Sequence, residues 1–287
     1  MPQLAALKRL VVLDCRGCKF EGALPTDMPP HLQRLLLADN RLDGPVHKWA
    51  CPKMRVLNLS HNKLSGVSLG GGVGCFADMP ELETLDCQGN RIEAPYAQMF
   101  GDRLPQSLTY LNCARNQFHG PIGSATSGAA SLEYLSLAHN HLTGPCSENF
   151  GLLSRLRDLR LGHNHLTGPL PLELTSMRSL RCLSLRGNDL VGPLDAVRWG
   201  GLNECLEHLD LGNNPRLGGR LEAVPPSDPL DPVHGARRRK RACCRSGALG
   251  PLRRSGAPTM VTPHGFGTLC GAAWSSTSQP TFRDASA

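Results

Sequence analysis

The sequence has few aromatic residues and no long apolar run. Only 5% of its 287 residues are Phe, Trp or Tyr, whereas a compact domain usually fills its centre with large rings. No window of about 18 apolar residues occurs, which excludes an ordinary membrane-spanning helix. The N-terminus shows no apolar segment followed by a small-residue cleavage site, so we expect no signal peptide. These absences favour a soluble chain with a thin, layered core.

The net charge of +7 belongs to the C-terminal part of the chain. From residue 225 onward there are nine Arg or Lys against three acidic residues, which leaves 22 basic and 21 acidic residues elsewhere. The run Arg237–Arg241 precedes Cys243 and Cys244 in a segment too poor in apolar residues to fold. We therefore expect a folded domain over 1–222 and a disordered, basic tail over 223–287. The basic run is a nuclear address, a contact with an anionic membrane, a solvated linker or a stretch read in the wrong frame.

The sequence does contain a motif, L-x-x-L-x-L-x-x-N-x-L, that returns nine times. The copies are LVVLDCRGCKF at Leu10, LQRLLLADNRL at Leu32, MRVLNLSHNKL at Met54, LETLDCQGNRI at Leu82, LTYLNCARNQF at Leu108, LEYLSLAHNHL at Leu132, LRDLRLGHNHL at Leu156, LRCLSLRGNDL at Leu180 and LEHLDLGNNPRL at Leu206. The Asn position is filled by Cys18 and then by Asn40, Asn62, Asn90, Asn116, Asn140, Asn164, Asn188 and Asn214. A pattern of this period indicates a solenoid of stacked repeats.

Each part of the motif predicts a local structure. The x-L-x-L segment alternates polar and apolar residues, which predicts a short strand with Leu inward. The chain then turns away, and an Asn there both donates to and accepts from backbone groups that the turn leaves buried. Cys15, Cys87 and Cys113 stand at inward Leu positions and are interpreted as small apolar core residues. Cys15 and Cys18 have the spacing of a metal or redox pair, but no second pair completes a zinc site.

A second signal follows the Asn in many repeats. Gly-Pro pairs begin at Gly44, Gly120, Gly144, Gly168 and Gly192. With these pairs, the segments LTGPCSENFGLLSRLRDLRL (142–161) and LTGPLPLELTSMRSLRCLSL (166–185) resemble the plant-type leucine-rich repeat, which adds L-x-G-x-[IL]-P after the Asn. The resemblance covers about residues 4–221. It implies an α/β leucine-rich repeat solenoid, curved and right-handed, with a parallel β-sheet on the concave face and an irregular or 3-10 convex side.

The resemblance also implies a function. Relatives of this type include receptor kinase ectodomains, receptor-like proteins and inhibitors of pathogen enzymes, so it implies a non-catalytic module that binds a protein or peptide in signalling or recognition. Two alternatives stay open, a fragment of a membrane receptor-kinase ectodomain and an enzyme inhibitor. The paired-Cys caps of secreted arrays and the kinase motifs H-R-D and D-F-G are missing. We expect a cytoplasmic monomer, or an extracellular or membrane-attached chain if it is a fragment, with no cofactor, no metal and no small-molecule substrate.

The candidate contact residues are the outward strand positions of the concave face. Tyr110 and Tyr134 occupy the same position in neighbouring repeats, so we expect their rings to lie side by side. Aromatic anchors among charges of both signs favour a protein or peptide over nucleic acid, which would require a stripe of basic residues. The full set is Arg34, Asp86, Tyr110, Asn112, Tyr134, Ser136, Asp158, Arg160, Arg186, His208 and Asp210.

Two further motifs have residue types that can bind ligands. HNHLTGP occurs at 139–145 and again at 163–169, which places His139 beside His163 and His141 beside His165. Four close imidazoles offer metal ligands or groups that titrate near neutral pH, but repeat duplication alone explains them. GGGVG at 70–74 has no Lys-Ser or Lys-Thr after it, so we interpret it as an inserted loop rather than a phosphate cradle.

Overall fold

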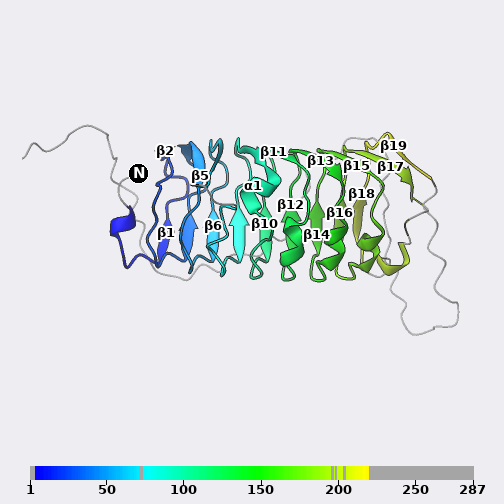
Figure 1. The fold of residues 1–287 in the computed structure, drawn as a ribbon. Coiled ribbons are helices and arrows are strands. Elements are labelled where there is room, and N and C mark those ends of the chain that lie inside the picture. The colour runs from blue at the N-terminus through cyan, green and yellow to red at the C-terminus, as the bar shows by residue number, and fades with distance from the viewer. Residues whose placement is uncertain (1–3, 71–73, 195–196, 198, 203–204, 220–287) are drawn as a thin grey trace, which may run out of the picture. The chain divides into compact units, whose positions relative to one another are not determined.

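A computed structural model of the chain describes residues 4–70, 74–194, 197, 199–202 and 205–219. The tail expected over 223–287 and the centre of the 70–74 loop lie outside the described residues. Within them the strands of successive repeats lie side by side in one row (Figure 1). No helix found in these ranges has both the length and the apolar content needed to cross a bilayer.

The main sheet is parallel and takes one three-residue strand from every copy of the motif. Its strands are β1 (Val12–Asp14), β3 (Arg34–Leu36), β6 (Val56–Asn58), β8 (Thr84–Asp86), β10 (Tyr110–Asn112), β12 (Tyr134–Ser136), β14 (Asp158–Arg160), β16 (Cys182–Ser184) and β18 (His208–Asp210), in this spatial order. Each strand pairs with the next at equivalent positions, for example Tyr110 with Tyr134 and Leu111 with Leu135. The side chains therefore form columns that run along the sheet.

The inward columns form the core. The central Leu of the strand is at most 1% exposed in seven consecutive repeats, at Leu35, Leu57, Leu85, Leu111, Leu135, Leu159 and Leu183. Cys87 and Cys113 take inward places two residues later and are equally buried, as the sequence predicts. Burial of each such Leu side chain contributes about 1.5–3 kcal/mol. The α/β solenoid expected from the repeats is thus confirmed, and its core is rich in Leu.

The segments after the Asn form a second parallel sheet that the sequence analysis did not predict. Six strands take part, β9 (Glu93–Pro95), β11 (Gln117–Gly120), β13 (His141–Pro145), β15 (His165–Gly168), β17 (Asp189–Pro193) and β19 (Arg216–Gly218). The earlier repeats contribute two separate pairs, β2 (Glu21–Ala23) with β4 (Arg41–Asp43) and β5 (Pro45–His47) with β7 (Gly66–Ser68). The Gly of each of the five Gly-Pro pairs named above has a positive φ, between 71° and 101°, a conformation that Gly adopts without a steric cost.

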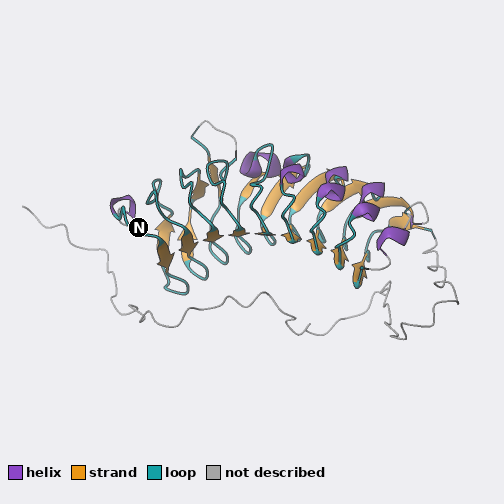
Figure 2. Ribbon diagram, turned by 90° about the horizontal axis from the view of Figure 1, so that it is seen from below, coloured by secondary structure: helices purple, strands orange, loops and turns teal. Residues whose placement is uncertain are grey.

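Helices in the described ranges are short, and most lie opposite the main sheet (Figure 2). They are one α-helix, α1 (Tyr96–Phe100), and the 3-10 helices η1 (Leu4–Ala6), η2 (Ala125–Gly128), η3 (Glu148–Leu152), η4 (Leu172–Ser176) and η6 (Trp199–Leu202). Gly151 of η3 packs directly on η4, where a Cβ at Gly151 would lie 2.7 Å from the Cβ of Glu173. The expected 3-10 side is therefore present, together with the second sheet.

The eight Asn side chains link each repeat to the one before it. In Asn164, Nδ2 donates to the carbonyl oxygens of Leu161 in its own repeat and Leu137 in the preceding one, both at 3.0 Å. Its Oδ1 accepts from the backbone N–H of Leu142 at 3.0 Å. All eight lie between 4% and 8% exposed. Each amide donates and accepts at once, so the turn leaves these backbone groups satisfied.

The residue before each of these Asn has a left-handed backbone conformation, which the repeat motif does not predict. It is Gly at only two of the eight positions, and the others are Asp39, His61, Arg115, His139, His163 and Asn213, with φ between 54° and 57°. A left-handed conformation costs a residue with a Cβ roughly 1–2 kcal/mol. The Asn hydrogen bonds that follow offset this cost at every turn.

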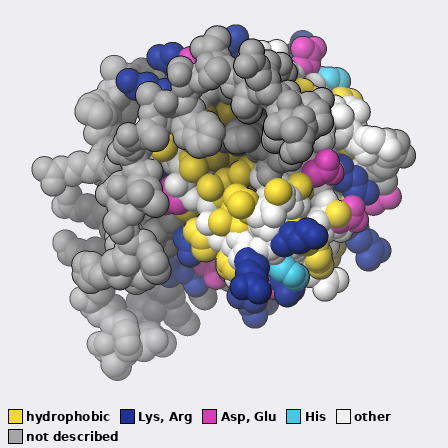
Figure 3. Space-filling view, turned by 90° about the vertical axis from the view of Figure 1, so that its left-hand side faces the viewer, with side chains coloured by type: hydrophobic (Ala, Val, Ile, Leu, Met, Phe, Trp, Pro, Cys, Tyr) yellow, Lys and Arg dark blue, Asp and Glu magenta, His cyan; other side chains and the backbone are white. Residues whose placement is uncertain are grey.

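The N-terminal end of the array shows apolar side chains at its surface, with Lys and Arg around them (Figure 3). Leu7, Val11 and Val12 are exposed, and Leu13 is only partly buried. No rung among the described residues stacks on the outer side of β1. The first repeat therefore contributes less burial to the core than those that follow it.

Candidate functional site

The outward strand positions form three columns on the solvent side of the main sheet. The first column holds the residue before the inward Leu of each strand, the second holds the residue after it, and the third holds the residue two positions farther on. The first column contains Thr84, Tyr110, Tyr134, Asp158 and Cys182; the second contains Asp86, Asn112, Ser136, Arg160 and Ser184; the third contains Gln88, Ala114, Ala138, Gly162 and Arg186. Every candidate contact residue lies in these columns or in their continuation at the two ends of the sheet.

Tyr110 and Tyr134 form the centre of this surface. Their rings are parallel within 8°, with centroids 4.6 Å apart, as expected from their equivalent places in neighbouring repeats. Burial raises the pKa of both phenols, so both stay neutral at physiological pH. Each residue is half-buried, and the pair presents a rigid aromatic edge to solvent.

A cation closes one end of the tyrosine stack. The guanidinium of Arg160 lies over the ring of Tyr134, with Cζ 5.5 Å from the ring centroid. The same guanidinium donates to both carboxylate oxygens of Asp158, at 2.9 and 2.7 Å. This bidentate pairing holds Arg160 in place and raises its pKa, because it stabilises the charged form. We call Asp86, Tyr110, Tyr134, Asp158 and Arg160 the tyrosine patch.

Asn112 and Ser136 lie beneath the tyrosine patch. They are 4% and 3% exposed, because the taller Tyr side chains cover them. Asn112 Nδ2 donates to Gln88 Oε1 at 2.6 Å and makes a longer contact, 3.4 Å, with the hydroxyl of Tyr110. The expectation that both residues face a partner therefore does not match their burial. They support the residues above them, and Gln88 is a member of the surface that the candidate set omitted.

The remaining candidate residues lie farther along the sheet. Arg186 and Asp210 are half-buried and approach to 3.9 Å, a weak ion pair, and His208 is exposed next to them on β18. Arg34 stands on β3, opposite Val12 and Val56. The aromatic and charged groups are therefore concentrated on strands β8 to β14, whereas Arg34 and His208 lie nearer the two ends of the main sheet.

The histidines form two stacks rather than a chelating cluster. His139 and His163 are parallel within 8° at 4.3 Å, and His141 and His165 within 10° at 6.0 Å. Parallel stacked rings do not direct their nitrogen lone pairs at one point between them, so this geometry does not favour a shared metal ion. Within the described ranges, no group of three His, Cys, Asp or Glu is arranged to hold a metal. Burial, His163 and Arg115 together lower the pKa of His139.

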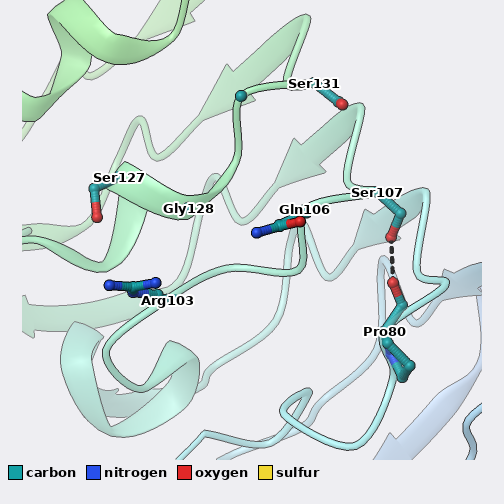
Figure 4. A pocket seen from close by; sticks show the side chains of 8 residues that line it. Pro80, Arg103, Gln106, Ser107, Ser127, Gly128 and Ser131 are labelled. Atoms are coloured by element: carbon teal, nitrogen blue, oxygen red, sulfur yellow. Dashed lines mark hydrogen bonds between the residues drawn. The ribbon is translucent and has the colours of Figure 1, made fainter.

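One pocket lies away from the columns, in the loops that lead into β8, β10 and β12 (Figure 4). Its volume is about 760 Å³, and it is lined by Pro80, Arg103, Gln106, Ser107, Ser127, Gly128, Ala130 and Ser131. The hydroxyl of Ser107 donates to the carbonyl oxygen of Pro80 at 2.7 Å. The lining contains one charged side chain, Arg103, and no carboxylate or imidazole. It therefore does not present an acid–base pair.

Comparison with known proteins agrees with the repeat geometry. The leucine-rich repeat family pattern matches residues 30–92 and 130–190. The two matched segments of the chain are leucine-rich repeats. Over 98 residues it is 35% identical to receptor-like protein 31 of Arabidopsis thaliana, a stretch that covers 33% of this chain and 11% of that protein.

Two solved structures share the fold of this chain. One is the crystal structure of PEPR1–AtPEP1, with a TM-score of 0.55, 24% identity, and coverage of 72% of this chain and 36% of that one. The other is the ectodomain of the Arabidopsis receptor kinase HAESA with an extended IDA peptide hormone, with a TM-score of 0.54, 22% identity, and coverage of 77% and 44%. The chain thus spans less than half the length of each relative, and at these identities the likeness concerns the fold alone.

Proposed function

We propose that this protein binds a protein or peptide through the solvent face of the main sheet, with the tyrosine patch at the centre of the contact. The observation that carries the proposal is the Tyr110–Tyr134 stack, fixed from below by Asn112 and at one end by Arg160. Rigid aromatic side chains with a polar end lose little entropy on binding, which is why Tyr is enriched at interfaces.

The charges of the surface support a protein partner. The candidate contact residues include Arg34, Arg160 and Arg186 against Asp86, Asp158 and Asp210, and two of these three arginines lie within 4 Å of one of these carboxylates. A nucleic-acid surface would instead present an unbroken stripe of basic residues to the phosphates. The surface therefore fits a partner with charges of both signs, and a catalytic or small-molecule function has less support.

The setting of the binding event is also a proposal. One relative is a receptor-like protein, and one of the two solved structures is the ectodomain of the receptor kinase HAESA in complex with a peptide hormone ligand. We infer that this chain acts as a recognition module outside the cell, in preference to the cytoplasmic location expected from the sequence. An enzyme inhibitor would use the same surface and stays the second candidate.

The test is a selection of binding peptides followed by point variants. A phage-displayed random peptide library is enriched on the purified chain, and the affinity of each enriched peptide is measured for wild type and for Tyr110→Ala/Tyr134→Ala. We expect affinity to fall about tenfold or more, because removal of a central aromatic anchor typically costs at least 1.4–2 kcal/mol. Leu152→Ala, on the exposed side of η3, is the control and should bind as wild type. Equal binding to the tyrosine variant would refute the proposal.

A further inference from the structure

The two ends of the tyrosine stack differ, and the difference indicates what this surface recognises. The outer face of Tyr134 is covered by Arg160, which is held by Asp158. The outer face of Tyr110 points toward the preceding strand, β8, where the residue paired with Tyr110 is Thr84. A Thr side chain ends at Cγ and is too short to cover an aromatic ring that extends well beyond it. No cation–π contact to Tyr110 occurs among the described residues.

A carboxylate stands beside this open end without a cation. Asp86 is the second-column residue of the same rung as Thr84, and it belongs to no ion pair within the described part of the chain. Its Oδ1 accepts from the backbone N–H of Gln88 at 3.0 Å, and the amide of Asn112 also bonds to the carboxylate. Its titratable neighbours are His61, Tyr110, Cys113 and Tyr134. Half-buried carboxylates usually form an ion pair, and Asp86 forms none with the described residues.

The open end thus has the two parts that hold Arg160 at the other end, an aromatic face and a carboxylate. At the closed end, the guanidinium stacks on Tyr134 and pairs with Asp158. At the open end, Tyr110 and Asp86 lie on neighbouring strands beside Thr84, and within the described residues neither of the two takes part in a cation–π contact or an ion pair. A guanidinium or ammonium placed there would gain a cation–π contact and a charge-assisted hydrogen bond together.

We propose that Tyr110 and Asp86 form a subsite for a cationic side chain of the partner, arginine above all. A planar guanidinium matches both groups, because it stacks on a ring while its N–H groups point in the ring plane toward a carboxylate. A bound arginine would lie over Thr84 and extend the row of Tyr110, Tyr134 and Arg160 by one member. The inference depends on the proposed function for its location, and it names the chemistry of the partner's central residue.

Asp86 also has a structural role, and the array itself provides the means to separate it from binding. Second-column Asx residues in other repeats accept from the backbone N–H two residues on, as in Asn58 with Ser60 at 3.0 Å. Asp86→Asn therefore keeps this bond and removes only the charge. Asp14 accepts from the backbone N–H of Arg16 in the same way at 3.3 Å, lies on β1 four strands before Tyr110 and is not a candidate contact residue, so Asp14→Asn is the matched control.

The experiment uses three short blocked peptides as probes: Gly-Arg-Gly, Gly-Lys-Gly and Gly-citrulline-Gly. Citrulline has the shape of arginine without its charge. Each peptide is titrated into the isotope-labelled full chain, and the ring resonances of Tyr110 are followed by NMR. We expect the arginine peptide to shift these resonances, the lysine peptide to bind more weakly, and citrulline to bind about tenfold less tightly or worse.

The variants decide the inference. Asp86→Asn should weaken binding of the arginine peptide about tenfold and bring it to the level of citrulline, whereas Asp14→Asn should leave binding unchanged. Equal binding of arginine and citrulline, no shift at Tyr110 with arginine, or full binding to Asp86→Asn would each overturn the subsite. These failures leave the peptides selected for the proposed function unaffected, because a partner that contacts Tyr110 and Tyr134 with a neutral side chain would still lose affinity in the tyrosine variant.

Discussion

The side-chain oxygen of Asn164 accepts a hydrogen bond from the backbone N–H of Leu142, 22 residues earlier, at 3.0 Å. The same amide donates backward to Leu137, so a single side chain joins two repeats in both directions. The same arrangement occurs along the array from Asn40 to Asn214. The ladder of Asn side chains therefore joins successive repeats along the array through the same hydrogen bonds at each step.

Asn164→Ala should lower the free energy of unfolding by about 3 kcal/mol, because it leaves several buried backbone groups without a partner, at about 1–3 kcal/mol each. Urea unfolding followed by circular dichroism measures the change. The control is Asn149→Ala in η3, whose side chain makes no hydrogen bond with the described residues, and it should change stability by less than about 0.5 kcal/mol. Equal effects of the two substitutions would show that the ladder does not stabilise the array.

Gly151→Ala should destabilise the chain by about 1–3 kcal/mol, because the new Cβ would lie 2.7 Å from the Cβ and 2.8 Å from the carbonyl oxygen of Glu173. The glycine is required by the close approach of η3 to η4. Gly218→Ala is the comparison, since a Cβ there meets nothing within 4 Å. Thermal unfolding of both variants tests the point, and a melting temperature of Gly151→Ala equal to that of Gly218→Ala would contradict it.

The stability of the chain should depend on the charge of Asp86. Burial raises the pKa of this carboxyl above its ordinary value of 3.8, although Gln88 and Asn112 act in the opposite direction. A raised pKa in the folded state means that the contribution is fully present below pH 3.8 and is lost as pH rises through the folded pKa. Asp86→Asn should therefore gain stability relative to wild type as pH increases toward 7.

Urea unfolding of wild type and Asp86→Asn at pH 3.5, 5 and 7 measures this dependence. The difference in unfolding free energy should be smallest at pH 3.5 and should favour the variant at pH 7. A wild type that is the more stable protein at pH 7 would contradict the assignment.

The buried thiols should resist modification in the folded chain. Burial raises the pKa of Cys75 and of Cys146 to about 12, so roughly one molecule in ten thousand carries either thiolate at pH 8. Iodoacetamide labelling followed by mass spectrometry should leave both cysteines unmodified until the chain is unfolded in urea. Rapid labelling of the native chain at either position would mean that the inward columns open to solvent.

The sequence was sufficient to predict the inward and outward columns, the Asn ladder and the pairing of Tyr110 with Tyr134, because a fixed repeat places equivalent residues at equivalent points. It did not reveal the second sheet, since the strands after the Asn, such as His141–Pro145, contain Gly and Pro and lack a clear alternation. It also did not reveal that Asn112 is buried, because its burial depends on the size of the neighbouring side chains. The contact of Arg160 with Tyr134 depends on rotamers that the motif does not specify.

The measurement that most directly tests the binding account is hydrogen exchange of the chain with and without a selected peptide. The account predicts added protection in β8, β10, β12 and β14, whose outward side chains form the tyrosine patch, and unchanged exchange in η3 and η4. Protection confined to η3 and η4, with the four strands unaffected, would contradict it.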